Sequence, residues 1–515
     1  MFSIKPLFVV FILLISVCQP AQALSQQWFS PSDNFDIQTL SEIYPNDTHF
    51  IWLKNQQLTV HAFDALDFIA SAPRHGLNAN KYHLSKLNKL DPRQDLPSAK
   101  RFEFLLSDGL LKFISDLKVG QFEASVVDPD WFIPQATFNA VNFLQQAILQ
   151  KHLKDELNSL IPNTDEYRLL TQTLAQYQSY AARGTWKTIP TSPLLRVGTR
   201  HPNIALIRAR LAYEDPFLSL STKQKATKYD EILEQAVRNF QRKHSLKVDG
   251  LVGKDTINAM NISAQDRVKQ IQIALERRRW MPKELGARYL KINLASYQLS
   301  AIENGEEKLA MRVIVGHKKR QTPSFTANMR NLVFNPYWNV PEKLARLDLL
   351  PKQQANLNYF YSNDIRVFTR EEGRKIEHNT YSIDWKSVSH LNFPYILRQD
   401  PGEHNALGRI KFMFKNPWGI YLHDTSHRAL FSKDKRSLSS GCIRVADPIG
   451  LANFSLSNTP EEKILDLLES DENKGLMVDN LLTIYAVYFT VSIEQNRVRF
   501  SPDIYQRDYR IAKLL

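Results

Sequence analysis

A cysteine and a histidine nineteen positions apart are the side chains of this sequence best suited to covalent chemistry. Cys442 lies in the segment 438–445, and His423 lies in the segment 419–425. An imidazole can take the proton of a thiol and hold a thiolate–imidazolium pair, and the thiolate attacks amide carbonyls. Either residue could instead be structural, because a lone cysteine is often an inert core side chain and a lone histidine a hydrogen-bonded one.

The residues around this pair alternate between apolar and polar, as in two β-strands. Successive side chains of a strand point to opposite faces, so each segment has apolar residues on one face and polar residues on the other. The expected core residues are Ile420, Leu422, Ile443 and Val445, and the expected open-face residues are Tyr421, His423, Cys442 and Arg444. Adjacent strands would therefore bring His423 close to Cys442.

The segment before Cys442 has the composition of a tight turn. Gly441 lets the backbone turn sharply and approach a substrate. The backbone N–H groups of Ser440, Gly441 and Cys442 are candidate donors to the oxyanion that forms when a thiolate attacks a carbonyl. Arg444 offers a planar fork for a carboxylate, although a surface ion pair is the alternative.

Length and charge set the broader class. At roughly 100–200 residues per domain, the 515 residues indicate about three domains. An apolar content of 43% excludes wholesale disorder. The formal net charge of +13 favours an anionic partner, and nucleic acid, anionic lipid and an anionic cell-wall polymer all qualify, as does a merely solvated basic surface.

The first residues are typical of an export signal. Lys5 precedes an apolar run at 7–17, and the run is followed by Ala21-Gln22-Ala23. This layout predicts a signal peptide at residues 1–23, with an uncleaved membrane anchor as the alternative. Cleavage would remove Cys18 and leave Cys442 as the only thiol. A single thiol in an oxidising compartment is a liability unless it has a use.

The middle of the chain reads as helical. Residues 24–193 repeat apolar side chains at helical spacing and contain no ligand cluster, which predicts a scaffold domain. Residues 194–262 form a compact unit, in which Asp230 can cap a helix and Asp249-Gly250 makes a turn. The apolar face of that helix is expected to carry Ile232, Leu233, Ala236, Val237 and Phe240. Residues 263–284 then form a helix that links back to the scaffold, with arginines at 277–279.

From residue 285 the hydrophobic period changes from helix to strand. Strands are expected at 290–295, 311–315, 331–334, 410–414 and 419–423, and the region 285–515 is expected to be the catalytic domain. Residues 342–405 lose the pattern and are interpreted as an insertion that could cover the site. The fold class expected for the whole chain is multidomain α+β: a helical scaffold, a three-helix module and a mainly-β domain with a capping subdomain.

Taken together, these motifs carry a family resemblance. His423, fifteen further residues and then Ser439-Ser440-Gly441-Cys442 resemble the signature of YkuD-type L,D-transpeptidases. The flanking segments resemble the larger, YcbB-like Gram-negative members; these segments are 335–341, 408–412, 421–424 and 503–505. The string at 236–256 resembles a peptidoglycan-binding domain. The sequence departs from many members at Ser440, where they have His, and at Arg444, where they have Asn.

The resemblance implies a crosslinking reaction of the cell wall. Cys442 would attack the amide between meso-diaminopimelate and D-Ala of a donor stem peptide, and a second diaminopimelate amine would resolve the thioester into a 3→3 crosslink. Expected substrate contacts are Arg444, Tyr421, Ser439 and Trp338. The resemblance further implies acylation by carbapenems, no metal or organic cofactor, no nucleic-acid partner, membrane contact only through an uncleaved signal, and the periplasm of a Gram-negative bacterium. What orients His423 stays open, since the Asp424 side chain should point the other way.

Two other functions fit the same residues. A cysteine hydrolase or L,D-carboxypeptidase that shortens wall peptides would use the same Cys and His. A non-catalytic wall-binding protein would use the module at 194–262 as its active part. The products of the reaction and the effect of replacing Cys442 distinguish these alternatives.

Overall fold

The structure, a computed structural model, describes residues 33, 35–45, 50–150, 152–184, 186–215, 218, 226–470 and 472–515. The predicted signal peptide at 1–23, with Cys18, lies outside these residues. The chain divides into two compact units, of which the first comprises residues up to 73 together with 77–118 and 138–161. The second comprises 74–76, 119–137 and 162–515. This division cuts across the scaffold domain expected at 24–193.

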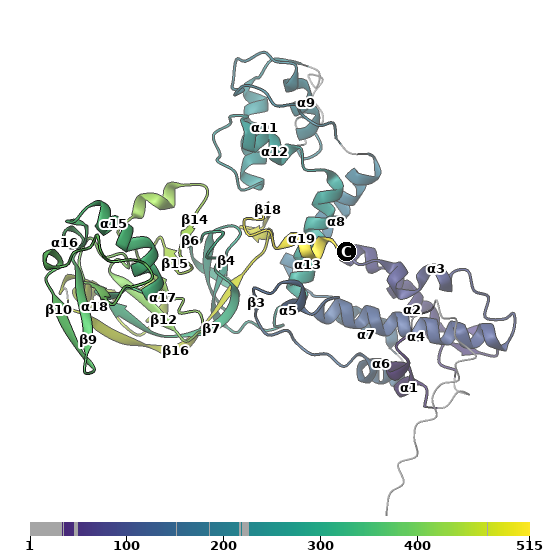
Figure 1. The fold of residues 1–515 in the computed structure, drawn as a ribbon. Coiled ribbons are helices and arrows are strands. Elements are labelled where there is room, and N and C mark those ends of the chain that lie inside the picture. The colour runs from purple at the N-terminus through teal and green to yellow at the C-terminus, as the bar shows by residue number, and fades with distance from the viewer. Residues whose placement is uncertain are drawn as a thin grey trace, which may run out of the picture. The chain divides into compact units, whose positions relative to one another are not determined.

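The first unit is helical around one long buried helix (Figure 1). Its elements are α1 (Ile37–Ile43), β1 (Leu53–Lys54), β2 (Gln57–Leu58), α2 (Val60–Ala70), η4 (Ala79–Tyr82), α3 (Leu84–Leu87), α4 (Leu96–Val119), α6 (Ala140–Leu149) and α7 (Leu153–Ser159). Glu103 on α4 is fully buried, and its carboxylate accepts backbone N–H bonds from Ile51, Trp52 and Leu53. These bonds supply the partners that a buried carboxylate requires. The helical expectation for this region is confirmed.

The second unit begins with several helices, of which α9, α11 and α12 share a small core of their own. The helices are α5 (Ala124–Val127), α8 (Asp165–Ala182), α9 (Asn203–Leu211), α11 (Glu231–Lys243), α12 (Lys254–Met260) and α13 (Ala264–Arg279). Asp230 caps α11 by accepting the N–H of Leu233, as expected. The prediction that Ile232 faces the core is wrong, because its side chain is 54% exposed. Gly250 has φ +71°, and Gln241 accepts the amides of Asp249 and Gly250, which fixes the expected turn.

Helix α13 packs against α8, and its arginines are bound in ion pairs. Arg277 pairs with Asp508 and Asp128, Arg278 with Glu166, and Arg279 with Glu276. Three cations this deeply placed are tolerated because each has a carboxylate partner. The arginine run is therefore structural.

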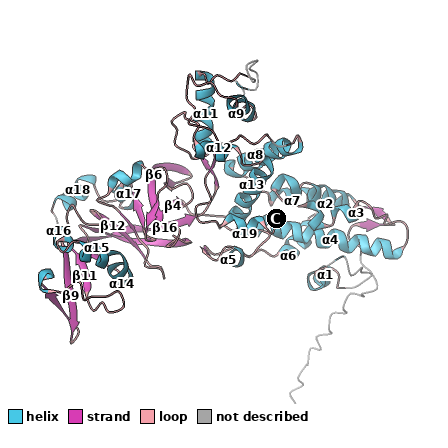
Figure 2. Ribbon diagram, turned by 45° about the horizontal axis from the view of Figure 1, so that its top comes forward, coloured by secondary structure: helices cyan, strands magenta, loops and turns pink. Residues whose placement is uncertain are grey.

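The catalytic region is built on a large sheet, coloured magenta in Figure 2. Its strand order is β12-β13-β15-β6-β5-β4-β16-β7-β3, and β12 also pairs with β7, so the sheet closes on itself. The strands are β3 (Trp131–Phe132), β4 (Arg288–Asn293), β5 (Gln298–Glu303), β6 (Glu306–Gly316), β7 (Ser324–Phe334), β12 (Ile410–Phe414), β13 (Leu422–His423), β15 (Ile443–Val445) and β16 (Lys474–Val487), with β14 (Ser437–Ser439) on β6. The mainly-β expectation is confirmed.

The rest of this region covers and extends the closed sheet. Helices α17 (Pro448–Ser455) and α18 (Glu461–Glu469) follow β15, and the short η7 (Arg428–Ser432) follows β13. The chain ends in the hairpin β17 (Val491–Glu494) and β18 (Arg497–Phe500), then α19 (Asp508–Ala512). Ile443, Val445, Leu451 and Ile464 belong to the same buried core, so the helices pack on the sheet that holds Cys442. Among the described residues we find no helix with the length and apolar character needed to cross a membrane.

The insertion is a folded subdomain with its own sheet and core, which we call the cap (residues 338–399). Its elements are β8 (Trp338–Asn339), α14 (Glu342–Leu344), η5 (Ala345–Leu349), α15 (Leu350–Ala355), α16 (Tyr359–Ser362), β9 (Ile365–Glu371), β10 (Arg374–His378), η6 (Thr380–Ser382) and β11 (Ile396–Gln399). The strand order is β10-β9-β11-β8, so the cap begins at Trp338, a little before the expected residue 342. Trp385, Phe360 and Val367 form its separate core.

Candidate active site

Three neighbouring strands hold the predicted pair: β13 ends at His423, and Cys442 directly precedes β15. Strand β13 runs parallel to β15, with Leu422 opposite Ile443 and His423 opposite Arg444. Strand β12 runs antiparallel to β13, with Lys411 opposite His423. The four expected core residues are buried; they are Ile420, Leu422, Ile443 and Val445. Polar side chains from three strands therefore share the face opposite the core.

The Cys442 thiol lies in a partly covered position beside Tyr421. Both the backbone amide and the side chain of Tyr421 hydrogen-bond to the sulfur, and the carbonyl of Gly419 lies 3.9 Å from Sγ. Burial raises the pKa of the thiol, and the hydrogen bonds from Tyr421 and the charges of Lys411 and Arg444 offset part of that rise. Cys442 is the one free cysteine among the described residues.

Tyr421 joins Cys442 to the cap. The Trp338 side chain hydrogen-bonds to Tyr421, which in turn hydrogen-bonds to Cys442. Burial and the neighbouring cysteine raise the pKa of Tyr421, so the phenol stays protonated. The Lys411 ammonium lies 4.0 Å from the centre of the Tyr421 ring, and the rings of Tyr421 and His423 are 5.6 Å apart. Two of the expected substrate-contact residues, Trp338 and Tyr421, thus lie in one chain of contacts with the thiol.

His423 is 5% exposed and is oriented by a backbone carbonyl. Its Nδ1 lies 2.5 Å from the main-chain oxygen of Asp424, which can only accept, so Nδ1 carries the proton of the neutral ring. The main-chain carbonyl of Leu407 also hydrogen-bonds the ring. The Asp424 carboxylate points away, as expected, and bonds the Arg428 guanidinium and the Arg409 amide. The main-chain carbonyl of Asp424 therefore orients His423, which answers the question that the sequence left open.

The resting protonation states differ from the thiolate–imidazolium pair that the sequence suggested. Burial, with smaller contributions from Arg444 and Lys411, lowers the pKa of His423 to about 3. Burial also raises the pKa of Cys442. The imidazole of His423 and the thiol of Cys442 are therefore both neutral at pH 7, because burial disfavours the charged form of each.

The turn that carries Cys442 is closed by the Ser439 side chain. Ser439 Oγ donates to the Cys442 carbonyl at 2.5 Å and accepts the Gly441 amide at 3.1 Å. Gly441 has φ +120°, a conformation in which other residues are strained. Because the hydroxyl of Ser439 is buried and used inside the turn, we revise its expected role from substrate contact to turn formation. The Gly441 amide is also engaged, which leaves Ser440 and Cys442 as the expected oxyanion donors.

A loop at residues 317–322 holds the same turn from outside. The His317 amide donates to the Ser439 carbonyl at 2.9 Å, Arg320 donates to Ser440 Oγ at 3.0 Å, and Thr322 Oγ1 donates to the Gly441 carbonyl at 2.8 Å. Thr322 Oγ1 also accepts the Gly316 amide at 2.9 Å. Arg320 makes a two-pronged ion pair with Asp348 of the cap. None of these loop residues was predicted, because nothing in their spacing marks them.

Arg444 and Lys411 supply positive charge to the open face. Burial lowers the pKa of both, and the neighbouring Cys442 opposes that shift. The buried Nε of Arg444 has no hydrogen-bond partner among the described residues. Ten other arginine Nε atoms of the described residues share this state, so Arg444 is distinguished by its position beside Cys442, where a planar guanidinium suits an incoming carboxylate. Lys411 is a site residue that the sequence interpretation missed; the alternation of β12 puts it opposite the core, but only strand pairing puts it beside His423.

No group of three or more His, Cys, Asp or Glu side chains that could hold a metal ion occurs in the described part of the chain. The ionisable groups of the face that adjoins Cys442 are a thiol, an imidazole, a phenol and two cations.

Three stretches of the chain match known family models. Residues 287–462 match the family model "YkuD", described as an L,D-transpeptidase catalytic domain, and residues 38–174 match a "Scaffold domain". Residues 200–260 match a model described as "Putative peptidoglycan binding domain". The chain thus carries a YkuD-type catalytic domain and a peptidoglycan-binding domain, as the sequence motifs predicted.

One curated relative and two solved structures illustrate the similarity. A "Putative L,D-transpeptidase" of Haemophilus influenzae is 36% identical over 222 residues, which is 43% of this chain and 44% of that protein. The alignment thus spans less than half of the relative. The crystal structure of an L,D-transpeptidase from Stackebrandtia nassauensis is 13% identical in sequence, covers 58% of this chain and 96% of its own, and has a TM-score of 0.22. That of an L,D-transpeptidase from Xylanimonas cellulosilytica is 15% identical, covers 58% of this chain and 99% of its own, and has a TM-score of 0.18. Superpositions this weak carry no argument.

Proposed function

We propose that this chain is a peptidoglycan L,D-transpeptidase that forms 3→3 crosslinks between meso-diaminopimelate residues, with Cys442 as nucleophile and His423 as base. The catalytic-domain match at 287–462 supports the class of reaction. The parallel pairing of β13 with β15 is the observation that supports the residue assignment, because β13 ends at His423 and Cys442 directly precedes β15.

In the first step the thiol is deprotonated as it attacks. The neutral His423 imidazole takes the proton while Sγ bonds to the carbonyl carbon of the amide between diaminopimelate and D-Ala. The amides of Ser440 and Cys442 receive the developing oxyanion, and the Tyr421 hydroxyl donates to the sulfur. The C–N bond then breaks, the imidazolium gives its proton to the leaving D-Ala amine, and a thioester on Cys442 remains.

In the second step an acceptor amine takes the place of D-Ala. The side-chain amine of another diaminopimelate attacks the thioester carbonyl and passes a proton to His423. The C–S bond breaks, and the sulfur recovers a proton from the imidazolium. Water in place of the amine would give an L,D-carboxypeptidase, so the product mixture reports how well the site excludes water.

The cations on the open face would bind the substrate's carboxylates. Arg444 has an unpartnered buried N–H, and Lys411 lies against the Tyr421 ring, so both can reach a carboxylate beside the thiol. Trp338 would bring the cap to the same substrate through its hydrogen bond with Tyr421. The departure from the usual Asn at position 444 thus fits a stronger carboxylate contact.

The same reaction predicts the inhibitors and the location. A carbapenem presents a strained amide that the same thiol would open, leaving a stable acyl adduct on Cys442. The predicted signal peptide would export the chain to the periplasm, where its substrate lies, and a retained signal would anchor it in the membrane. The formal net charge of +13 suits the anionic wall.

The test is mass spectrometry of the purified chain with diaminopimelate tetrapeptides and, separately, with meropenem. The expected results are a crosslinked dimer with release of D-Ala, and a single meropenem adduct mapped to Cys442. Both should vanish in Cys442→Ala. A dimer still formed by Cys442→Ala, or an adduct on another residue, would refute the mechanism, and a shortened peptide without dimer would assign the hydrolase alternative.

The role of His423 is tested with a matched pair of variants. His423→Gln should lower transfer by about 10²–10⁴-fold, the usual contribution of a general base. His427→Gln is the control, because His427 is exposed and four residues away. Equal rates in the two variants would remove His423 from the mechanism.

A further inference from the structure

A large cleft lies between the three-helix module and the catalytic domain, away from the face that carries Cys442. Its volume is about 1430 Å³. Its walls come from α11, α12 and α13, the β4–β5 turn, the segment 434–437 and the C-terminal hairpin, all within the second compact unit. Cavities for small ligands are usually about 300–1,000 Å³, so this volume suits part of a polymer.

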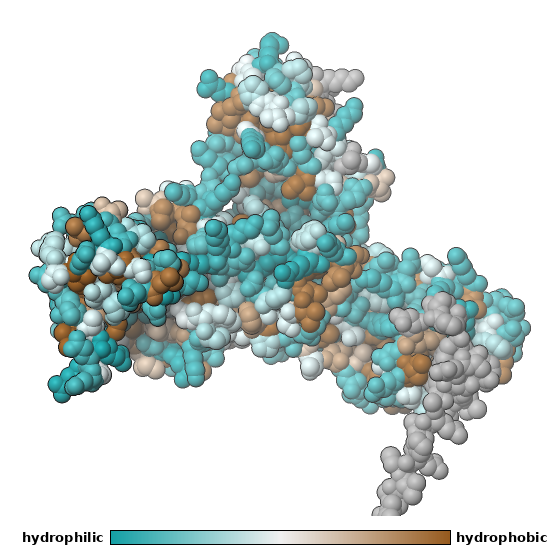
Figure 3. All heavy atoms as spheres, viewed as in Figure 1, coloured by the Kyte–Doolittle hydropathy of each residue, from teal (hydrophilic) through white to brown (hydrophobic). Residues whose placement is uncertain are grey.

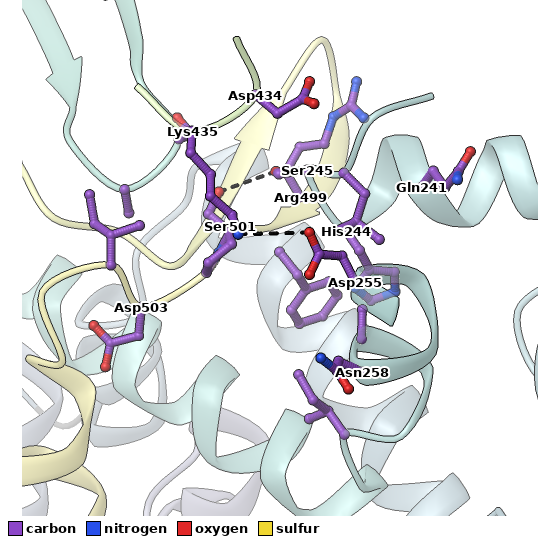
Figure 4. A pocket seen from close by; sticks show the side chains of 18 of the residues that line it. Gln241, His244, Ser245, Asp255, Asn258, Asp434, Lys435, Arg499, Ser501 and Asp503 are labelled. Carbon is purple, nitrogen blue, oxygen red and sulfur yellow. Dashed lines mark hydrogen bonds and ion pairs between the residues drawn. The ribbon is translucent and has the colours of Figure 1, made fainter. Parts of the chain in front are cut away.

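The polar lining carries both signs of charge. Figure 4 shows Lys435 and Asp255 facing each other, with Asp434, Arg499 and Asp503 on the surrounding walls. Amide side chains of Asn258, Gln270 and Gln298 also line the space. A site for a polyanion needs cations in clear excess. This lining instead offers donors and acceptors in similar numbers, which suits a neutral chain rich in hydroxyl and acetamide groups.

Apolar side chains complete the lining. Leu194, Val248, Ile262 and Tyr509 line the cleft and are exposed. Figure 3 shows hydrophobic residues on the surface of the module formed by α9, α11 and α12, at the top of the view. Exposed apolar residues beside planar polar groups match a sugar ring, which has an apolar face and a polar edge.

One buried hydroxyl in the cleft lacks a partner. Ser296 Oγ lies on the β4–β5 turn, its residue is 9% exposed, and it has no hydrogen-bond partner among the described residues. Arg499 Nε on the C-terminal hairpin is also buried, and it is paired with the Glu494 carboxylate 3.8 Å away. Buried polar atoms normally have partners, so a ligand hydroxyl or carbonyl would supply what the protein leaves open here.

The cleft wall is continuous with the turn that carries Cys442. Arg436 is buried and donates to the carbonyls of Val313 and Tyr297, which fixes the segment 434–437 on the sheet. Three residues further on, Ser439 closes the turn around Cys442. On the module side, the Lys435–Asp255 pair at 3.7 Å and the Ser245–Ser501 bond at 3.2 Å cross the cleft, and both members of the ion pair are well exposed. Such an exposed pair contributes little and can yield to a ligand.

We propose that this cleft binds the N-acetylated aminosugar chain of peptidoglycan, so that the module and the catalytic domain together hold a glycan strand whose attached peptides reach Cys442. The proposal rests on the proposed function, since it names the part of the substrate that the peptidoglycan-binding domain and the transpeptidase domain share. It assigns the cleft to the glycan and the Cys442 face to the peptide.

The test uses the full chain and chitotetraose, a tetramer of β-1,4-linked N-acetylglucosamine. Binding is measured by isothermal titration and by saturation-transfer NMR. The double variant Asn258→Ala/Gln298→Ala removes one amide from each wall and should weaken binding at least tenfold. Asn239→Ala is the matched control, because Asn239 is an exposed asparagine of the same module that does not line the cleft.

A second readout separates this proposal from the proposed function. On free tetrapeptides the double variant should crosslink as fast as the wild-type chain, whereas on glycan-linked peptides it should crosslink several-fold more slowly. If the wild-type chain crosslinks free peptides but does not bind chitotetraose, or binds it as well after the double substitution, the cleft proposal is overturned. If the wild-type chain binds chitotetraose but forms no crosslink from any peptide, the proposed function fails instead.

Discussion

The turn at residues 439–442 and the cap at 338–399 both adjoin the thiol, but they are held in different ways. The turn is tied by buried bonds within the catalytic sheet, from the Ser439 hydroxyl inside and from Thr322 outside. The cap has its own sheet and core and reaches the turn through Arg320 and Asp348, two partly exposed side chains. It also meets the site through the Trp338–Tyr421 hydrogen bond.

This difference separates two requirements of the reaction. A nucleophile must sit within a fraction of an ångström of its productive position, which buried, fully paired bonds provide. A part that covers substrates must let a bulky peptide in and out, which exposed ionic contacts allow because they are weak in water. We therefore expect substitutions in the turn to reduce the chemistry itself and substitutions at the cap contact to affect substrate capture.

The largest effect is expected at Thr322. In Thr322→Val the shape is kept, but the buried Gly316 amide and the Gly441 carbonyl lose their common partner. Leaving such groups unpaired costs about 1–3 kcal/mol of stability, and the displaced turn should slow transfer by about 100-fold. Thermal unfolding and kcat/KM on tetrapeptides measure the two effects.

The control for Thr322 lies on the strand that follows it. Thr326 is on β7, opposite Tyr485 of β16, away from the turn. Thr326→Val should leave both stability and transfer close to wild type. Similar losses in both variants would show that the strand as a whole, and not the bond to the turn, matters.

The amino-acid pattern identifies the candidate reacting residues but not the residues that support them. Cys442 and His423 stand in apolar–polar alternation, and the strand periodicity alone places them on one face. The loop at residues 317–322 that holds the turn gives no such signal in the sequence. His317, Arg320 and Thr322 lie more than a hundred residues before Cys442, and no periodicity links them to it. The revised role of Ser439 has the same origin: a serine in a motif does not tell whether its hydroxyl points outward or closes the turn.

The fold is predictable at the level of domains and less so in its details. Alternating strands and a helical capping signal identify the mainly-β domain and helix α11. The sequence of the cap shows no strand periodicity, because its strands, such as β10, are exposed and lack apolar alternation. Lys411 escapes prediction because it becomes a site residue only through the pairing of β12 with β13, a contact that local spacing does not encode.

The second effect concerns the contact between cap and turn. Arg320→Lys cannot bond both Asp348 oxygens and the Ser440 hydroxyl at once, because an ammonium lacks the planar fork. We expect about a tenfold loss of kcat/KM on tetrapeptides, mainly through KM. Alkylation of Cys442 by iodoacetamide, a reagent too small to need the cap, should stay unchanged.

Two further variants sharpen this result. Asp348→Asn removes the ionic contact on the cap side and should act in the same direction. Arg346→Lys is the matched control on the same η5 segment, because Arg346 pairs with Glu342 and not with the turn. If Arg320→Lys slows alkylation as much as transfer, Arg320 belongs to the turn, and turn and cap do not differ in the way proposed.

A smaller effect is expected at Lys411, whose charge comes from the sheet and not from the cap. Lys411 lowers the pKa of Cys442 against the rise caused by burial. Lys411→Met should therefore raise the pKa of the thiol, reduce the thiolate fraction at pH 8 and slow iodoacetamide alkylation several-fold, with the rates converging at higher pH. Lys415→Met, an exposed lysine just past the same strand, is the control. If the pH dependence of alkylation is unchanged in Lys411→Met, the charge of Lys411 does not help to ionise Cys442.

The smallest effect is a modest loss of folding stability at acid pH, caused by the buried His423 on the catalytic sheet. The pKa of His423 is about 3 in the folded protein and near 6.5 when unfolded, so between these values the unfolded state binds one more proton. The stability that His423 contributes is complete above pH 6.5 and is lost as the pH falls toward 3. From pH 7 to 6 the loss should be about 0.7 kcal/mol, which His423→Gln removes and His427→Gln does not. Urea unfolding at both pH values measures this loss of stability. Hydrogen exchange should show β12 and β13 losing protection before β9 and β10. If the stability of wild type and of His423→Gln changes equally with pH, His423 is already protonated, or not buried, in the folded chain.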